Sequence, residues 1–121
     1  MKGEIENSME LLEELDGDYR AAFLFPRSFV GFQGHFPGNP ILPGVCMIHS
    51  LLVLCQTRQE RRLILKEIVS AKFYTGIGPG ERIEFSCRER SLEEEDLQIF
   101  ARVTSRGKRV AELKIVATLQ S

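Results

Sequence analysis

Two histidines are the side chains best suited to acid–base chemistry in this 121-residue chain, and it contains no others. His35 lies in a stretch rich in proline and glycine, and His49 follows fourteen residues later in an apolar run. An imidazole with its unperturbed pKa of about 6.5 can accept or donate a proton near neutral pH. Because two imidazoles at this spacing give no metal-ligand pattern, the pair predicts proton transfer with no metal and no cofactor.

The segment that carries His35 is predicted to be a stiff loop. Residues 34–44 contain three prolines and three glycines. Each proline fixes its own φ and pushes the preceding residue toward an extended conformation. Each glycine permits backbone shapes, or a close approach to the backbone, that other residues resist. A loop of this composition is expected to hold His35 in one place.

Residues 43–59 predict a single long helix, with Pro43 tolerated in its first turn. From Ile41 to Cys55 the only polar side chains are those of His49 and Ser50. A helix that is apolar on all sides is expected to be buried on all sides. At about 15 residues this run is shorter than the ~20 needed to cross a bilayer. We therefore expect the helix in a protein core and no membrane partner.

Most of the remaining chain shows the alternation of apolar and polar residues that is typical of half-buried strands. Asp16-Gly17 predicts a first hairpin, and residues 1–7 are expected to be loose. The long apolar segment 63–74 is expected to be a central strand. Two strands, one helix and four more strands indicate an α+β fold with an antiparallel sheet. The strands are expected near residues 8–15, 18–26, 63–74, 83–88, 97–104 and 111–119.

The composition is that of one globular domain covering residues 1–121, with 43% hydrophobic and 27% charged residues. A net charge of −1, without a basic stripe, gives no reason to expect a nucleic acid partner. Residues 1–4 lead into an acidic segment, so no signal peptide is expected and the cytoplasm is the predicted location. We interpret the three cysteines as small core residues.

A family resemblance rests on residues 34–45, which read Gly-His-Phe-Pro-Gly-Asn-Pro-Ile-Leu-Pro-Gly-Val. This run closely resembles the signature of the β-hydroxyacyl-(acyl carrier protein) dehydratases of fatty acid synthesis. The likeness continues more weakly through residues 71–73, 79–81 and 107–112. It implies a hot-dog fold, in which an antiparallel sheet of about six strands wraps around one long central helix.

The resemblance also implies roles for individual residues. His35 matches the catalytic histidine that removes the α-proton of a 3-hydroxyacyl thioester. His49 falls where the family has a catalytic carboxylate, and Val53 falls where it usually has a glutamine. The first backbone N–H groups of the helix can donate hydrogen bonds to the thioester oxygen as it gains charge. The predicted catalytic residues are thus His35 and His49, and the predicted substrate-binding residues are Phe36, Pro43, Gly44, Val45 and Val53.

The family further implies an acyl thioester on an acyl carrier protein as the partner, and a homodimer or a dimer of dimers in which two subunits complete each site. Two alternatives stay open. A non-catalytic hot-dog protein could bind acyl chains or an acyl carrier, and a thioesterase could share the fold. The arginines at the end of the helix, Arg58, Arg61 and Arg62, could either form a solvated end or dock an acidic carrier.

Overall fold

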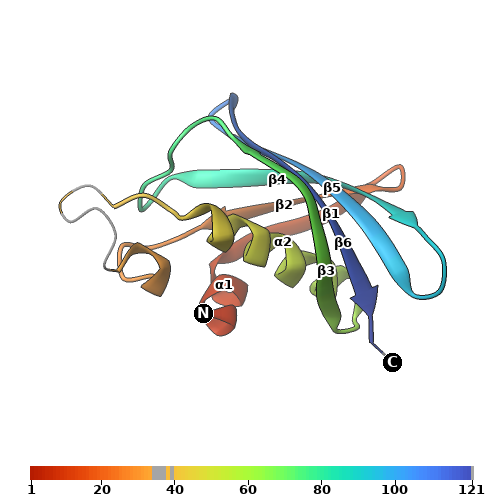
Figure 1. Cartoon of the computed structure of the whole chain (residues 1–121). Coiled ribbons are helices and arrows are strands. Elements are labelled where there is room, and N and C mark those ends of the chain that lie inside the picture. Colours follow the sequence, from red (N-terminus) through yellow and green to blue (C-terminus); the bar gives the residue numbers. More distant parts are fainter. Residues whose placement is uncertain (34–37, 39, 121) are drawn as a thin grey trace.

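The computed structural model describes residues 1–33, 38 and 40–120, and its elements follow the predicted order closely. A six-stranded antiparallel sheet packs against one long helix (Figure 1). The expected α+β architecture is therefore confirmed. The elements are α1 (Lys2–Ser8), β1 (Met9–Leu15), β2 (Asp18–Leu24), a short 3-10 helix η1 (Val30–Phe32), α2 (Gly44–Gln59), β3 (Leu63–Phe73), β4 (Arg82–Ser91), β5 (Asp96–Ser105) and β6 (Lys108–Leu119).

The strands follow the order β1-β2-β4-β5-β6-β3 in the sheet. Two of the tight turns have positive φ at both central residues, Asp16-Gly17 at 49° and 85° and Arg106-Gly107 at 52° and 76°. These are the turns whose twist matches that of paired strands, so the Asp-Gly signal predicted the first hairpin correctly. Alternation within β5 places Ile99 and its alternate neighbours in the core.

The helix α2 lies against the sheet, as Figure 1 shows, and buries one side completely. Leu51, Leu54 and Cys55 are fully buried there, and each buried side chain of this kind contributes about 1.5–3 kcal/mol. The expectation of burial on all sides was wrong. A stripe at helical spacing stays open, because Val45 is 66% exposed and His49 is only partly buried.

The strand β3 lies at one edge of the sheet, so its prediction as a central strand was wrong. It pairs with β6 on one side, and no described strand pairs with the other. Its apolar side chains are instead left open: Ile68 is 47% exposed and Phe73 is 48% exposed. An apolar run therefore indicates a surface that can be covered by another molecule as well as a position inside a sheet.

The N-terminal segment was also predicted wrongly, because residues 2–8 form the helix α1. Its Ile5 is fully buried, and α1 packs against α2. Burial of Ile5 contributes about 1.5–3 kcal/mol to holding this polar segment in place. Across the described part of the chain, no helix is long and apolar enough to cross a membrane.

Candidate active site

The N-terminal end of α2 offers free hydrogen-bond donors. Pro43 is the N-cap residue, with extended backbone and no side-chain cap. Its carbonyl accepts the N–H of Cys46 at 2.9 Å. Within the described chain no acceptor takes the N–H groups of Gly44 and Val45, as is usual for the first turn of a helix. These two donors, together with the positive end of the helix dipole, can stabilise a developing negative charge on an oxygen.

A pocket of about 240 Å³ lies beside this helix end. Phe73 covers Gly44 so closely that a Cβ on Gly44 would lie 2.6 Å from the ring carbon Cζ. The close approach explains why glycine occupies the first position of the helix. The apolar wall suits a hydrocarbon chain next to the free N–H groups. The pocket is lined by Ile41, Leu42, Gly44, Met47, Phe73, Tyr74, Thr75 and Gly76.

Both described flanks of the proline-rich loop lie at this same end of α2. Before the loop, Gly31 packs against the helix, since a Cβ there would lie 2.8 Å from Cys46 Sγ. After the loop, the N–H of Leu42 donates to the carbonyl of Ile77 at 2.7 Å. The predicted catalytic His35 and the predicted substrate-binding Phe36 lie outside the described residues.

The second predicted catalytic residue, His49, lies one turn beyond Val45 on the same open stripe of α2. At 1.5 Å per residue the two are about 6 Å apart along the helix. The α2 hydroxyls of Ser50 and Thr57 bond back to helix carbonyls at 2.7 and 2.9 Å. Within the described residues the His49 side chain makes no comparable bond.

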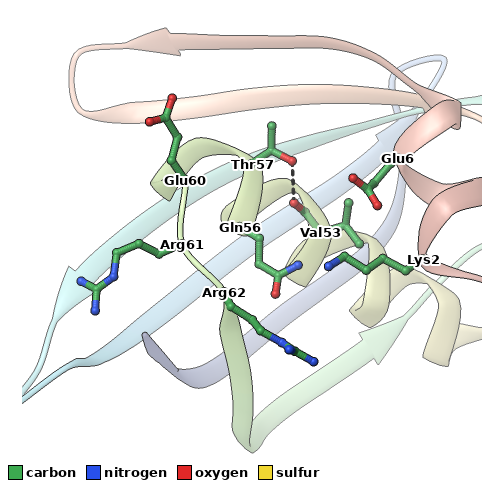
Figure 2. A pocket seen from close by; sticks show the side chains of 8 residues that line it. All are labelled: Lys2, Glu6, Val53, Gln56, Thr57, Glu60, Arg61 and Arg62. Atoms are coloured by element: carbon green, nitrogen blue, oxygen red, sulfur yellow. Dashed lines mark hydrogen bonds between the residues drawn. The ribbon is translucent and has the colours of Figure 1, made fainter. Parts of the chain in front are cut away.

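The last predicted site residue, Val53, lies in a different pocket. This pocket has a volume of about 430 Å³ and is found near the C-terminal end of α2 (Figure 2). Val53 is 2% exposed there and contributes an apolar wall. The predicted site residues therefore divide between the two ends of the helix: Pro43, Gly44 and Val45 lie at the start, and Val53 lies two turns beyond Val45.

A buried carboxylate near the C-terminal end of α2 brings together three donors. Glu89 on β4 has a side chain only 10% exposed. Its Oε1 accepts from Gln59 Nε2 at 2.7 Å and from Arg58 Nη1 at 3.2 Å. Its Oε2 accepts the hydroxyl of Tyr19, whose ring lies 4.5 Å from the Arg58 guanidinium carbon. This cluster ties the last turn of α2 to β2 and β4.

Two thiols border the same cluster. Cys55 Sγ lies 2.8 Å from the hydroxyl of Tyr19. Burial raises the pKa of Tyr19, Cys55 and Cys87, so all three remain neutral at physiological pH. Arg58 Nε lies 2.9 Å from Glu14 Oε1 and forms an ion pair with it. The geometry of the N–H group does not allow a hydrogen bond to that oxygen, so this buried N–H has no acceptor among the described residues. The cysteines are free and buried, as predicted.

Sequence reasoning did not find this cluster, because its members come from separate segments without a common spacing. The predicted solvated end of the helix was correct only in part. Arg58 is held inside by Glu89, whereas Arg61 pairs with Glu95 at 3.2 Å near the surface. In the described ranges, no three histidine, cysteine, aspartate or glutamate side chains are placed to hold a metal ion.

The sequence matches a known family along most of its length. The family described as ApeI-like, ApeI dehydratase, matches residues 12–114. The chain belongs to the ApeI-like dehydratase family. A 3-hydroxyacyl-(acyl-carrier-protein) dehydratase FabZ of Wolbachia sp. subsp. Drosophila simulans is 34% identical over 99 residues, which cover 74% of this chain and 68% of that protein. A FabZ of Nitratidesulfovibrio vulgaris is 32% identical over 88 residues, covering 64% and 57%.

Solved structures place this member of the ApeI-like family in the hot-dog fold. The dehydratase heterocomplex ApeI:P from Xenorhabdus doucetiae superimposes with a TM-score of 0.73 at 20% identity, covering 91% of this chain and 96% of that one. A hypothetical thioesterase with coenzyme A from Streptococcus pneumoniae has a TM-score of 0.69 at 11% identity, covering 95% and 88%. At these identities the likeness shows the fold alone. The fold implied by the signature is therefore confirmed.

Proposed function

We propose that this chain dehydrates 3-hydroxyacyl thioesters carried on an acyl carrier protein to trans-2-enoyl thioesters, in fatty acid or polyene-like lipid biosynthesis in the cytoplasm. The observation that carries the proposal is the open start of α2. There Gly44, whose N–H group is free like that of Val45, lines a largely apolar pocket in a chain of the ApeI-like dehydratase family. These are the groups that a thioester oxygen needs as it becomes negative.

The reaction divides among the residues as follows. His35 acts as the base that takes a proton from the α-carbon, and the electrons move onto the thioester oxygen. That oxygen is held by the N–H groups of Gly44 and Val45. The negative charge then returns to form the α–β double bond, and the β-hydroxyl leaves as water with a proton from an acid. His49 lies at the family's carboxylate position and orients or protonates this hydroxyl.

The direct test is an assay with purified protein and two substrates, a 3-hydroxyacyl thioester and the matching trans-2-enoyl thioester on a carrier. Interconversion of the two supports the dehydratase. Release of free thiol would instead indicate a thioesterase, which is disfavoured because α2 contains no aspartate or glutamate from Gly44 to Gln59. Tight binding of the acyl carrier without either reaction would indicate a non-catalytic acyl-binding protein.

A substitution at Gly44 tests the pocket at the start of α2. Alanine there would place its Cβ 2.6 Å from Phe73 Cζ, so the ring must move out of its position. Since an ångström-scale misplacement can cost a hundredfold in rate, we expect Gly44→Ala to lower kcat/KM by on the order of tenfold to a hundredfold. Thermal unfolding of this variant checks that the fold is intact, because moving the Phe73 ring can itself cost stability.

The matched control is Gly3→Ala on α1, where an added Cβ meets nothing within 4 Å. Full activity of Gly44→Ala, or an equal loss in both variants, would show that the Phe73 contact does not shape the substrate pocket.

We also propose that two copies of the chain pair through β3, as a homodimer or within a dimer of dimers. The edge strand β3 exposes four apolar side chains along its length, Ile64, Ile68, Val69 and Phe73, which are called the apolar band here. An unpaired apolar edge strand is costly in water, and pairing with a second β3 would both satisfy its backbone and cover the band. The open stripe of α2 would then lie near this subunit interface, where a second subunit can contribute to the site.

Lysine at position 68 tests this interface. A buried, unpaired ammonium in this interface is unfavourable, so we expect Ile68→Lys to change the chain from dimer to monomer at micromolar concentration. Sedimentation velocity measures this change. The control Val30→Lys introduces the same charge at a residue 45% exposed outside β3 and should leave the dimer intact. A dimer that survives Ile68→Lys would place the interface elsewhere.

A mixed dimer is the second candidate assembly, favoured by the absence of a carboxylate on α2. The Xenorhabdus doucetiae neighbour is a dehydratase heterocomplex, and a different hot-dog subunit could supply a carboxylate opposite His35. This assembly predicts that the chain is inactive alone and gains activity with His49→Glu. Activity of the unmodified chain alone would support the His35/His49 pair instead.

A further inference from the structure

The pocket at the C-terminal end of α2 is lined by hydrogen-bond donors that are paired with no acceptor among the described residues. Leu63 donates its N–H to Gln56 Oε1 at 3.0 Å, which fixes the amide so that its nitrogen faces the pocket. In Figure 2 the amide nitrogen of Gln56 and the ammonium end of Lys2 point toward each other. Two hydrogen-bond donors that face each other across a cavity can both be satisfied by one acceptor bound between them.

The guanidinium of Arg62 adds a second full positive charge to the same pocket. The preceding residue differs in this respect, since Arg61 is paired with Glu95 at 3.2 Å. No ion pair of Arg62 or Lys2 is formed within the described chain. Arginine and lysine both bind phosphate through charge-assisted hydrogen bonds, and a side-chain amide can add a further donor.

The carboxylates of Glu6 and Glu60 also line the pocket, so its positive charge is local to Lys2 and Arg62. The end of a helix carries about half a negative charge, against two full positive charges on Lys2 and Arg62. Glu60 also lines the pocket, but Figure 2 places it at the far end of the view from both cations. Glu6 lies on α1 one turn after Lys2, and no ion pair joins the two in the described structure. The part of the pocket that is lined by Lys2, Gln56 and Arg62 therefore favours a bound anion.

The distance to the start of α2 suggests which anion. From Gln56 back to Val45 the helix rises about 16 Å at 1.5 Å per residue. A phosphopantetheine arm has thirteen bonds between its phosphorus and its sulfur, and spans about 15 Å at the ~3.5 Å per three bonds of an extended chain. The open stripe of α2, with His49 between these ends, connects the two positions.

We propose that Lys2, Gln56 and Arg62 bind the phosphate of the phosphopantetheine arm that carries the substrate, while the thioester lies at the free N–H groups that begin α2. The proposal rests on the proposed function, because it takes its ligand from the carrier of the acyl group. It gives the arginine-rich end of α2 a role in recognising the carrier's prosthetic group.

The binding test follows the side-chain amide of Gln56 by nuclear magnetic resonance in the full chain, with 4′-phosphopantetheine, pantetheine and inorganic phosphate as probes. We expect phosphopantetheine to shift the Gln56 signal and to bind about tenfold more tightly than pantetheine, because the phosphate adds charge-assisted hydrogen bonds. Inorganic phosphate should bind more weakly than phosphopantetheine. Equal affinity for phosphopantetheine and pantetheine, or for phosphopantetheine and inorganic phosphate, would overturn the assignment.

Two double variants with matched charge separate a local site from a general field. Lys2→Gln/Arg62→Gln should abolish the preference for phosphopantetheine. Arg106→Gln/Lys108→Gln removes the same two charges at the turn between β5 and β6 and should preserve the preference. An equal loss in both double variants would contradict a specific site.

A thioester without a phosphate separates this inference from the proposed function. If the protein dehydrates a 3-hydroxyacyl pantetheine thioester but Lys2→Gln/Arg62→Gln does not change its preference for phosphopantetheine, the reaction stands and the phosphate site is wrong. If the preference depends on Lys2 and Arg62 but no thioester is dehydrated, the phosphate site stands and the reaction is wrong.

Discussion

Alanine in place of His35 should lower the rate of dehydration by two to four orders of magnitude. A positioned general base contributes about 10²- to 10⁴-fold to a proton transfer, and water is a poor substitute beside a weakly acidic α-carbon. The free N–H groups of Gly44 and Val45 remain in this variant. We therefore expect kcat to fall steeply while KM changes little, since binding of the thioester does not require the base.

The control is His49→Ala, which removes the other imidazole from the half-open stripe of α2. Its effect should be smaller, about tenfold, because water can take over the orientation of a hydroxyl more easily than the removal of the α-proton. Thermal unfolding of both variants checks that the fold is intact. If His35→Ala keeps wild-type kcat, His35 is not the base, and if only His49→Ala is inactive, the two roles must be exchanged.

Removal of the Glu89 carboxylate should cost about 3 kcal/mol of stability, at the low end of the range for breaking a buried charge pair. Glu89→Ala leaves the Arg58 charge, the hydroxyl of Tyr19 and the amide of Gln59 without their shared acceptor. The low end applies because the Arg58 side chain is 22% exposed and keeps its contact with Glu14. In a domain of this size the melting temperature should fall by roughly 10 °C.

Two further variants define what the cluster requires. Glu89→Gln keeps an acceptor of the same shape, so its loss should be smaller, about 1–2 kcal/mol. Glu93→Ala removes one carboxylate from the exposed turn between β4 and β5 and should change the stability by no more than about 0.5 kcal/mol. Urea unfolding followed by circular dichroism measures all three. Equal midpoints for Glu89→Ala and Glu93→Ala would show that the buried cluster contributes nothing beyond a surface charge.

Much of the fold was predictable from local pattern. The Asp16-Gly17 turn, the helix from about Pro43 to Gln59 and the alternation in β5 each depend on neighbours in sequence, and each was predicted correctly. The family signature around His35 was equally local, and it led to the correct family. The open N–H groups at Gly44 and Val45 follow from the same reasoning, since any helix begins with unpaired donors.

Other features depend on contacts between distant segments. The sequence alone determined that residues 63–73 form an apolar strand, but only the pairing of strands decided that β3 lies at the edge, because periodicity does not specify a strand's neighbours. The same holds for the Glu89 cluster and for the pocket of Lys2, Gln56 and Arg62, because each brings together side chains from separate segments of the chain. Local residue types and spacing determined the elements, their turns and the family motif. Tertiary packing decided which apolar and charged surfaces remain open, because burial depends on the shape that surrounds a side chain and not on its neighbours in sequence.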